Sequence, residues 1–243
     1  MKIDLVCLGI GKGATYVMKG KPSSAFAIRV DEKPTLLVDC GAGVVLSCLK
    51  NLNGAIPDAI YITHNHMDHT GDLPIAIDAI REQNGTKPRI LGHSSVLSLV
   101  KKHRLHELTA TGKSLKEIAD WIEPDSSNVI VVEDDLIVRL FQSVHSYTCY
   151  GFMLEKSDRA ILGYSADSAF DEDIYAKIAQ APVAIVDGRE TGNHDHASFR
   201  EIETFGKHIP NCSIRVIHYE QTQYVFSVPN VKLLQEGEVI QLV

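Results

Sequence analysis

The stretch ITHNHMDHTGD, residues 62–72, constrains this chain more than any other. It has the pattern H-x-H-x-D-H and directly continues the apolar run DAIYI. Alternate side chains of an extended segment point to the same side. We therefore expect His64 and His66 to converge on one metal ion, while Asp68 and His69, beyond a turn, face a second position.

The donor types of this motif predict the kind of ion that it binds. Imidazole and carboxylate groups without thiolate suit Zn²⁺, with Mn²⁺ or Fe²⁺ as alternatives. One motif cannot complete two tetrahedral sites, so further ligands must come from later in the chain. Three candidates each follow a predicted strand, namely His145 after LIVRLFQSV, Asp167 after RAILGYSA and His218 after SIRVI.

Charge and composition exclude other classes of protein. The 243 residues carry a formal net charge of −7, which disfavours a long nucleic acid as partner. KKHR, residues 101–104, is the one basic cluster, and we interpret it as a solvated helix face. No apolar run approaches the ~20 residues of a membrane span, so we expect a cytoplasmic protein without membrane contact. Five scattered cysteines without a CxxC pair indicate reduced thiols.

Strand and helix patterns alternate along the chain without a repeat or linker, which predicts an α/β (α+β) fold. We expect two sheets to meet face to face, with helices outside and ligands gathered at one sheet edge. Strands are expected at 2–8, 23–30, 34–41, 58–64, 88–93, 128–134, 136–145, 149–156, 159–167, 182–188, 213–220 and 236–243. Helices are expected at 41–52, 71–83, 94–108 (with a serine as N-cap), 171–180 and 197–209.

The order of these motifs resembles the metallo-β-lactamase fold hydrolases, and within them the ribonuclease Z-like phosphodiesterases. LGIGKG, LLVDCG, ITHNHMDHTGD, His145, LGYSADS and His218 carry the resemblance over essentially the whole chain. It implies a four-layered αββα sandwich, one domain over residues 1–243 and two zinc ions, with Mn²⁺ as the alternative. One ion would be held by His64, His66 and His145 and the other by Asp68, His69 and His218, with Asp167 bridging both.

Two neighbouring stretches have alternative interpretations. We interpret GIGKG, residues 9–13, as a tight turn with no clear helix after it rather than as a dinucleotide loop. Asp39, in VDCG, either orients a ligand histidine or caps the helix expected at 41–52.

Departures from other branches of the family narrow the activity. His66 stands where oxygen-reducing di-iron members carry glutamate, which favours hydrolysis. The stretch after His145 lacks the G-H-T-x-G signature of glyoxalase and lactonase types. Asp167 stands where many β-lactamases have cysteine. These features resemble the phosphodiesterase branch. In that branch two metal ions, one of them bound by Asp68, would trap a hydroxide that attacks phosphorus.

The stretch VDGRETGNHDHASFREIETF, residues 186–205, resembles the part of that branch that supplies a general acid. His196 would protonate the leaving oxygen, and Asp187 would polarise its ring, because an alkoxide is a poor leaving group without a proton. Glu190 remains an alternative partner, His194 a weaker candidate acid, and helix capping an alternative role for His196.

The short interval between His145 and Asp167 leaves no room for the arm with which tRNA-maturing members grip their substrate. The chain resembles the compact anti-Pycsar type, which destroys cyclic pyrimidine signals. That implies a phosphodiesterase for a small phosphodiester, a 3′,5′-cyclic mononucleotide, and a homodimer. A tRNA 3′ endonuclease and a nucleotide-binding sensor without turnover are the alternatives. The aromatic run at 219–228 could serve a dimer interface, the substrate or the core.

Overall fold

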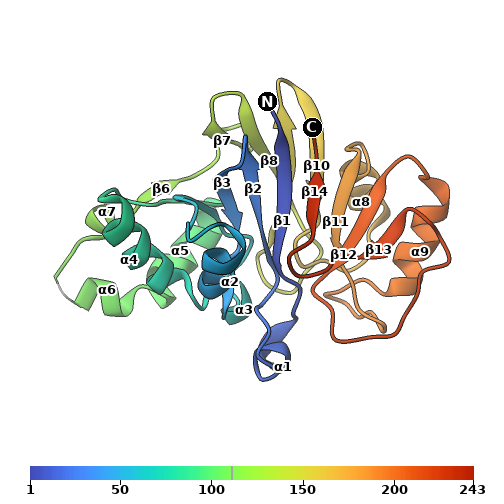
Figure 1. The fold of residues 1–243 in the computed structure, drawn as a ribbon, viewed down its shortest axis with the longest axis horizontal. Coiled ribbons are helices and arrows are strands. Elements are labelled where there is room, and N and C mark those ends of the chain that lie inside the picture. The colour runs from blue at the N-terminus through green and yellow to red at the C-terminus, as the bar shows by residue number, and fades with distance from the viewer. Residues whose placement is uncertain (111) are drawn as a thin grey trace. The chain divides into compact units, whose positions relative to one another are not determined.

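The structure is a computed structural model that describes residues 1–110 and 112–243. Its chain divides into two compact units, each built on one seven-stranded sheet (Figure 1). Unit 1 comprises Met1–Pro124, Glu236–Gln241 and Val243, and unit 2 comprises Asp125–Gln235 and Leu242. The expected single domain over residues 1–243 stays a prediction.

The sheet of unit 1 is antiparallel at one edge and parallel at the other. β1 is buried along its whole length, as its nearly continuous apolar sequence predicts. β3 to β6 run parallel. From edge to edge the strands are β14 (Val239–Gln241), β1 (Ile3–Gly9), β2 (Ala25–Val30), β3 (Lys33–Val38), β4 (Ala59–Tyr61), β5 (Arg89–Leu91) and β6 (Asp120–Ile122).

Seven helices of the described residues belong to unit 1, and the larger ones lie along one face of its sheet in Figure 1. The fourth of them has Pro74 in its first turn, where proline is tolerated, and ends at Gly85 in a left-handed conformation. The helices are α1 (Gly13–Val17), α2 (Val44–Asn51), α3 (Met67–Thr70), α4 (Leu73–Asn84), α5 (Ser94–His103), α6 (His106–Ala110) and α7 (Leu115–Ile118).

The sheet of unit 2 likewise changes from antiparallel to parallel pairing. β11 is wholly buried between parallel neighbours, whereas β8 alternates buried and exposed residues, as a half-solvated antiparallel strand should. α8 (Glu172–Ile178) packs on β10 and α9 (Phe199–His208) on β13. From edge to edge the strands are β13 (Val231–Leu233), β12 (Ser213–Ile217), β11 (Val183–Asp187), β10 (Arg159–Tyr164), β9 (Tyr150–Lys156), β8 (Leu136–Gln142) and β7 (Val129–Glu133).

Every strand and helix expected from the pattern is present, but one expected helix is divided and five short elements of the described residues were not expected. The short helix α1 follows GIGKG, where none was expected. The expected helix 94–108 is divided into α5 and α6, and its N-cap is His93, whose ring accepts the N–H of Ser95. The strands β6 and β13 and the short helices α3 and α7 were not anticipated either, because no run of alternating or periodic apolar residues marks them. β6 and β13 form by pairing with β5 and β12.

The carboxyl ends of the parallel strands place the candidate site residues. In unit 1, Asp39 follows β3 and His64 follows β4. In unit 2, Asp167 follows β10, Asp187 ends β11 and His218 follows β12. Since the carboxyl ends of parallel strands meet at one edge of a sheet, each unit gathers its candidates at a single edge.

The five cysteines are all free and buried. Burial raises the pKa of Cys212 to about 11 and that of Cys48 to about 12, with Asp72 adding to the second shift. These side chains therefore act as small apolar groups of the core.

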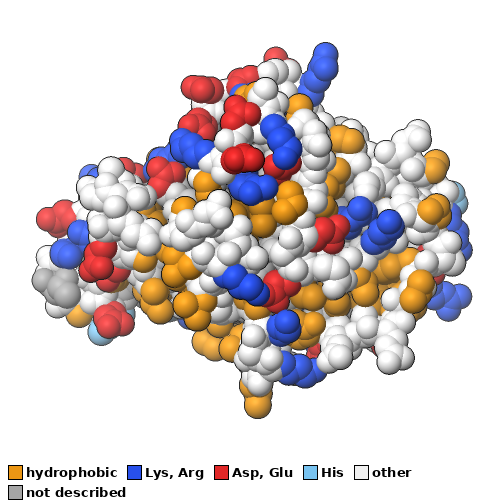
Figure 2. Space-filling view, viewed as in Figure 1, with side chains coloured by type: hydrophobic (Ala, Val, Ile, Leu, Met, Phe, Trp, Pro, Cys, Tyr) orange, Lys and Arg blue, Asp and Glu red, His pale blue; other side chains and the backbone are white. Residues whose placement is uncertain are grey.

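The surface carries charges of both signs close together. Figure 2 shows Lys and Arg side chains interspersed with Asp and Glu over the face drawn. Within the described residues, no helix is both long enough and apolar enough to cross a membrane.

Candidate active site

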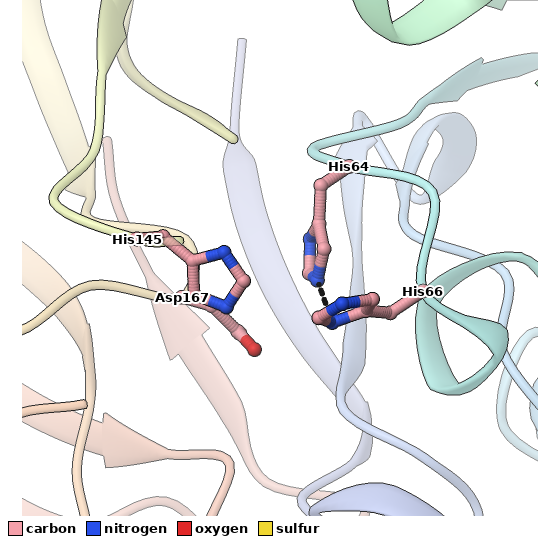
Figure 3. A group of neighbouring side chains, drawn as sticks. All are labelled: His64, His66, His145 and Asp167. Carbon is pink, nitrogen blue, oxygen red and sulfur yellow. Dashed lines mark hydrogen bonds between the residues drawn. The ribbon is translucent and has the colours of Figure 1, made fainter. Parts of the chain in front are cut away.

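The first two histidines of H-x-H-x-D-H converge as predicted. Nε2 of His64 lies 2.9 Å from Nδ1 of His66, and Figure 3 shows the two rings pointing toward one another. Two nitrogens bound to one tetrahedral zinc ion at ~2.1 Å would lie roughly 3.4 Å apart. The pair therefore fits two ligands of a single ion. The ring of His69 lies 4.1 Å from that of His64, centroid to centroid, and is tilted by 46° against it.

Asp39 orients two of these histidines from a fully buried position. Its Oδ2 lies 2.8 Å from Nδ1 of His69, and it accepts the N–H and hydroxyl of Thr63 at 2.9 and 2.8 Å. Because the Thr63 hydroxyl donates to Asp39, its oxygen accepts from Nδ1 of His64 at 3.0 Å. Each ring therefore donates its Nδ1–H to an oxygen, that of Thr63 for His64 and that of Asp39 for His69. Nε2 of each ring is left as the atom that can bind a metal.

The same contacts decide between the two roles predicted for Asp39. The N-cap of α2 is Gly43 rather than Asp39, and the carboxylate of Asp72 accepts the N–H of Val45 in the first turn of that helix at 3.2 Å. Burial raises the pKa of the Asp39 carboxyl, and the charge and hydrogen bond of His69 act against that rise. Asp39 thus positions His69 and Thr63, as the orienting interpretation proposes.

Asp68 is held by the glycine-rich turns around it. Its Oδ2 accepts the backbone N–H of Gly13 at 2.8 Å, so the GIGKG stretch contacts the metal motif directly. Gly41 lies so close to the backbone of Asp68 that an added Cβ would stand 1.8 Å from its carbonyl oxygen. Only glycine fits there, which explains VDCG after β3.

Arg104 braces the backbone of the motif from the end of α5. Its Nη2 donates to the carbonyl of Asn65 at 2.6 Å and its Nε to the hydroxyl of Thr70 at 2.8 Å. Thr70 in turn donates to the carbonyl of His66 at 2.7 Å. Burial lowers the pKa of Arg104. The interpretation of residues 101–104 as a solvated face is therefore wrong for Arg104, whose partners lie too far along the chain for a local pattern to indicate.

The carboxyl edge of unit 2 carries a second cluster. Asp187, 1% exposed, places Oδ2 2.6 Å from Nδ1 of His196 and Oδ1 3.2 Å from Nδ1 of His218. Nδ1 of His218 also lies 3.4 Å from Oδ1 of Asp167. The ligand atoms of these four buried residues all lie within 4.8 Å of one another, an arrangement that could hold a metal ion.

His145 lies in the loop after β8 and is half exposed. Its Nδ1 accepts the backbone N–H of Tyr147 at 3.1 Å and lies 3.2 Å from the carbonyl oxygen of the same residue, while Figure 3 shows the ring next to Asp167. Asp195 fastens this loop by accepting the N–H of Ser146 at 2.6 Å and its hydroxyl at 2.9 Å. Burial alone would raise the pKa of Asp195, but these bonds and the nearby His145 and His194 lower it.

Three non-glycine residues of these loops have a left-handed backbone. Their φ angles are 61° for Asp39, 54° for Ala166 and 63° for His218. Such conformations are disfavoured for L-residues and gather where a surrounding network holds a side chain in a required place. Each lies directly after, or within two residues of, a parallel strand.

The contacts of His196 answer two questions left open by the sequence. Its partner is Asp187, while Glu190 instead accepts the hydroxyl of Thr222. Its role is not capping, because α9 begins with Ser198 as N-cap in a capping box with Glu201. His194, with a side chain that is 81% exposed, pairs with Asp195 and not with this cluster.

Sequence reasoning missed Arg189. Its Nη2 lies 2.7 Å from Nε2 of His196, on the side of the ring opposite Asp187. In the sequence, the only indication of a role for Arg189 at the site is its position two residues after Asp187. The contact itself depends on the fold of the loop between Arg189 and His196. Arg104 and Asp195 were missed for the same reason.

The aromatic run at 219–228 packs within unit 2. The rings of Tyr224 and Phe226 lie 5.1 and 5.5 Å from that of Phe199 on α9, and the Tyr219 hydroxyl donates to the carbonyl of Leu234. Of the three roles considered for this run, these contacts correspond to ordinary packing.

Comparison with known proteins places the chain in a family. A family model described as anti-Pycsar protein Apyc1 matches residues 3–240. The chain belongs to the anti-Pycsar protein Apyc1 family. This Apyc1-family chain is 26% identical to ribonuclease Z of Enterococcus faecalis over 195 residues, which cover 77% of the chain and 61% of the relative. With ribonuclease Z of Pediococcus pentosaceus it shares 23% identity over 236 residues, 96% of the chain and 72% of that protein. The chain thus spans less than two thirds of the E. faecalis protein.

Solved structures show the fold of the Apyc1-family chain. The metallo-β-lactamase fold protein YhfI from Bacillus subtilis matches 99% of the chain, and the match covers all of YhfI, with a TM-score of 0.77 and 16% identity. The short form of human tRNase Z matches with a TM-score of 0.71 and 22% identity, over 99% of each chain. The predicted metallo-β-lactamase fold and the resemblance to ribonuclease Z-like proteins are confirmed.

Proposed function

We propose that this chain is a two-metal phosphodiesterase that hydrolyses a small phosphodiester, with 3′,5′-cyclic mononucleotides as the substrate class. Membership of the anti-Pycsar protein Apyc1 family supports it. So do the relatives named ribonuclease Z and the mouse protein named zinc phosphodiesterase ELAC protein 1, which is 26% identical over 202 residues.

The donor sets of the two units support a dinuclear zinc centre. Imidazole and carboxylate groups are the ligands that zinc takes when no thiolate is present, and Mn²⁺ is the alternative ion. Two bound ions would supply water of lowered pKa and Lewis-acid stabilisation of phosphate oxygens. The residues proposed to hold them are His64, His66 and His145 for one, Asp68, His69 and His218 for the other, and Asp167 for both.

The buried pair of Asp187 and His196 is the observation that carries the proposal. With Nδ1 held 2.6 Å from Asp187, the ring of His196 can deliver a proton only from Nε2. A phosphodiester with an alkoxide leaving group needs that proton, and a protein that only binds a nucleotide has no need of it. Asp187 also contacts His218, so one carboxylate orients both the proposed acid and a proposed ligand.

A small substrate is favoured by the segment between His145 and Asp167. β9 and β10 form a hairpin there, and its two-residue turn has Ser157 and Asp158 with φ of 49° and 61°. Both angles fit a tight type I′ turn. No inserted arm that could grip a long RNA lies in this part of the described chain.

We further propose that the protein is a cytoplasmic homodimer. Large apolar side chains exposed on unit 1 support an interface, since a buried dimer contact would cover them. They include Met18, Leu46, Met67 and Ile75, each at least 60% exposed. Sedimentation equilibrium should give twice the mass of the chain.

A mass-spectrometric screen tests the activity. Zinc-loaded protein is incubated with bis-p-nitrophenyl phosphate, the 3′,5′-cyclic mononucleotides, linear dinucleotides and a precursor tRNA. We expect cleavage of bis-p-nitrophenyl phosphate and of at least one cyclic mononucleotide, and loss of both activities in Asp68→Ala and His66→Ala. Inactivity on every phosphodiester at full metal occupancy would refute the proposal.

A tRNA 3′ endonuclease is the second candidate, favoured by the relatives named ribonuclease Z. Removal of the 3′ trailer from precursor tRNA at submicromolar protein, without cleavage of cyclic mononucleotides, would establish it in place of the first. Recovery of a tightly bound nucleotide unchanged would instead identify a sensor.

A further inference from the structure

The guanidinium of Arg189 has one side-chain partner in the described part of the chain, and that partner is a histidine ring. Nη2 lies 2.7 Å from Nε2 of His196, which is 8% exposed. Nε of Arg189 is buried and lacks a hydrogen-bond partner among the described residues. An arginine guanidinium is suited to two parallel hydrogen bonds with a carboxylate or a phosphate, and the partly exposed Arg189 makes no such pair among the described residues, so it has donors to spare.

The backbone holds Arg189 and His196 in this relation. The N–H of Arg189 donates to the carbonyl of Ala197 at 2.9 Å, and the N–H of Phe199 donates to the carbonyl of Arg189 at 2.7 Å. These two bonds join the chain directly after His196 to the segment that follows β11. The contact is therefore built into the loop rather than being a chance approach of a long side chain.

The direction of the hydrogen bond determines which form of His196 is present. A guanidinium only donates, so Nε2 must accept and carries no proton. The single N–H of the ring is then on Nδ1 and faces Asp187. In this arrangement His196 has no proton to give on the side away from Asp187. Before Nε2 of His196 can carry and donate a proton, it must lose its contact with Arg189.

A phosphodiester would offer Arg189 a stronger partner than the ring. Its non-bridging oxygens share a full negative charge, and a guanidinium binds two such oxygens through parallel N–H groups. A neutral imidazole nitrogen offers one uncharged acceptor. An anionic phosphate that reaches Arg189 should therefore take the guanidinium from His196.

We propose that Arg189 is the phosphate-recognition residue of this site, and that its guanidinium moves from Nε2 of His196 to a non-bridging oxygen of a bound phosphodiester. The move selects the substrate by its charge and frees Nε2 of His196, which must then take a proton from solvent before it can protonate the leaving oxygen. The inference rests on the proposed function for its substrate class, but the contact itself belongs to unit 2 alone.

Binding of diethyl phosphate, an inert phosphodiester anion, tests the proposal without turnover. Calorimetric titration is made on the zinc-loaded wild type, Arg189→Lys, Arg189→Gln and Arg200→Gln, the last a control on the exposed Arg200 of α9. We expect at least tenfold weaker binding in Arg189→Gln, a smaller loss in Arg189→Lys, which keeps the charge, and no change in the control.

Steady-state kinetics separate recognition from a merely structural role. With bis-p-nitrophenyl phosphate, whose leaving group needs no proton, Arg189→Gln should raise KM about tenfold, the same factor as its loss of affinity, and change kcat less than twofold. Unchanged affinity for diethyl phosphate, or a loss confined to kcat, would overturn the proposal. A wild type that binds diethyl phosphate through Arg189 but cleaves no phosphodiester would refute the proposed function and leave this inference standing.

Discussion

At the scale of single residues, Asp39 shows how one buried carboxylate prepares a metal motif. It accepts from Thr63 and from His69, and through Thr63 it also fixes the ring of His64. Its left-handed backbone, with φ of 61°, aims the carboxylate back toward the strand end of β4. An asparagine tolerates the same backbone, so Asp39→Asn removes the charge and leaves the turn intact.

We expect Asp39→Asn to weaken zinc binding by about 10–100-fold, because partners that orient metal-binding histidines contribute by that factor. Competition with a chromophoric chelator measures the affinity. Asp78→Asn, on the exposed side of α4, serves as the control and should bind zinc as the wild type does. Equal affinity in Asp39→Asn and the control would contradict the orienting role.

At the scale of elements, each candidate residue is placed by where a strand or helix ends. The parallel strands end at Asp39, His64, Asp167, Asp187 and His218 or one to three residues before them, so pairing of the strands sets their spacing. Helix α5 ends at the residue before Arg104, and that stop directs its side chain at Asn65 and Thr70. α9 starts from its own capping box at Ser198, which leaves His196 outside the helix.

Arg104→Met should loosen the metal motif from the end of α5. It deletes two hydrogen bonds from a charged donor, so we expect a loss of about 1–3 kcal/mol in the free energy of unfolding. We also expect faster amide hydrogen exchange over residues 65–70. Lys102→Met changes an exposed neighbour on the same helix and should alter neither quantity. Exchange rates that match the wild type in Arg104→Met would show that the motif needs no brace.

At the scale of the whole molecule, the proposed ligands are divided between two units. H-x-H-x-D-H belongs to unit 1, and His145, Asp167 and His218 belong to unit 2. A ligand that binds only the folded state at about 100 times its Kd stabilises that state by about 2.7 kcal/mol. If zinc takes ligands from both units, it must stabilise both at once.

Removal of the metal tests this division. We expect chelation to lower the midpoint of thermal unfolding and to speed hydrogen exchange at residues 64–70 of unit 1 and at β12 of unit 2. His218→Ala, a change in unit 2, should abolish the zinc-dependent protection of residues 64–70. His208→Ala, on an exposed histidine of α9, should preserve it. Full protection of residues 64–70 in His218→Ala would mean that unit 1 binds zinc alone.

Local pattern was enough to predict most of the long strands and helices and the donor chemistry of the metal motif, whereas the metallo-β-lactamase fold was implied by the resemblance of the motifs to that family. The elements and the donor chemistry follow from the periodicity of apolar residues and from side-chain type, both of which are written along the chain. The pairing of His64 with His66 also follows from local spacing, because alternate residues of an extended segment share a side.

Only the tertiary structure decided which groups surround those residues. Asp187 rather than Glu190 meets His196, Arg189 faces the other side of its ring, and Arg104 reaches the backbone of Asn65. The sequence by itself determined which side chains can bind a metal or transfer a proton, since that chemistry belongs to each side chain. Their partners were decided by the fold, because hydrogen bonds between distant residues depend on how strands pair and where helices stop.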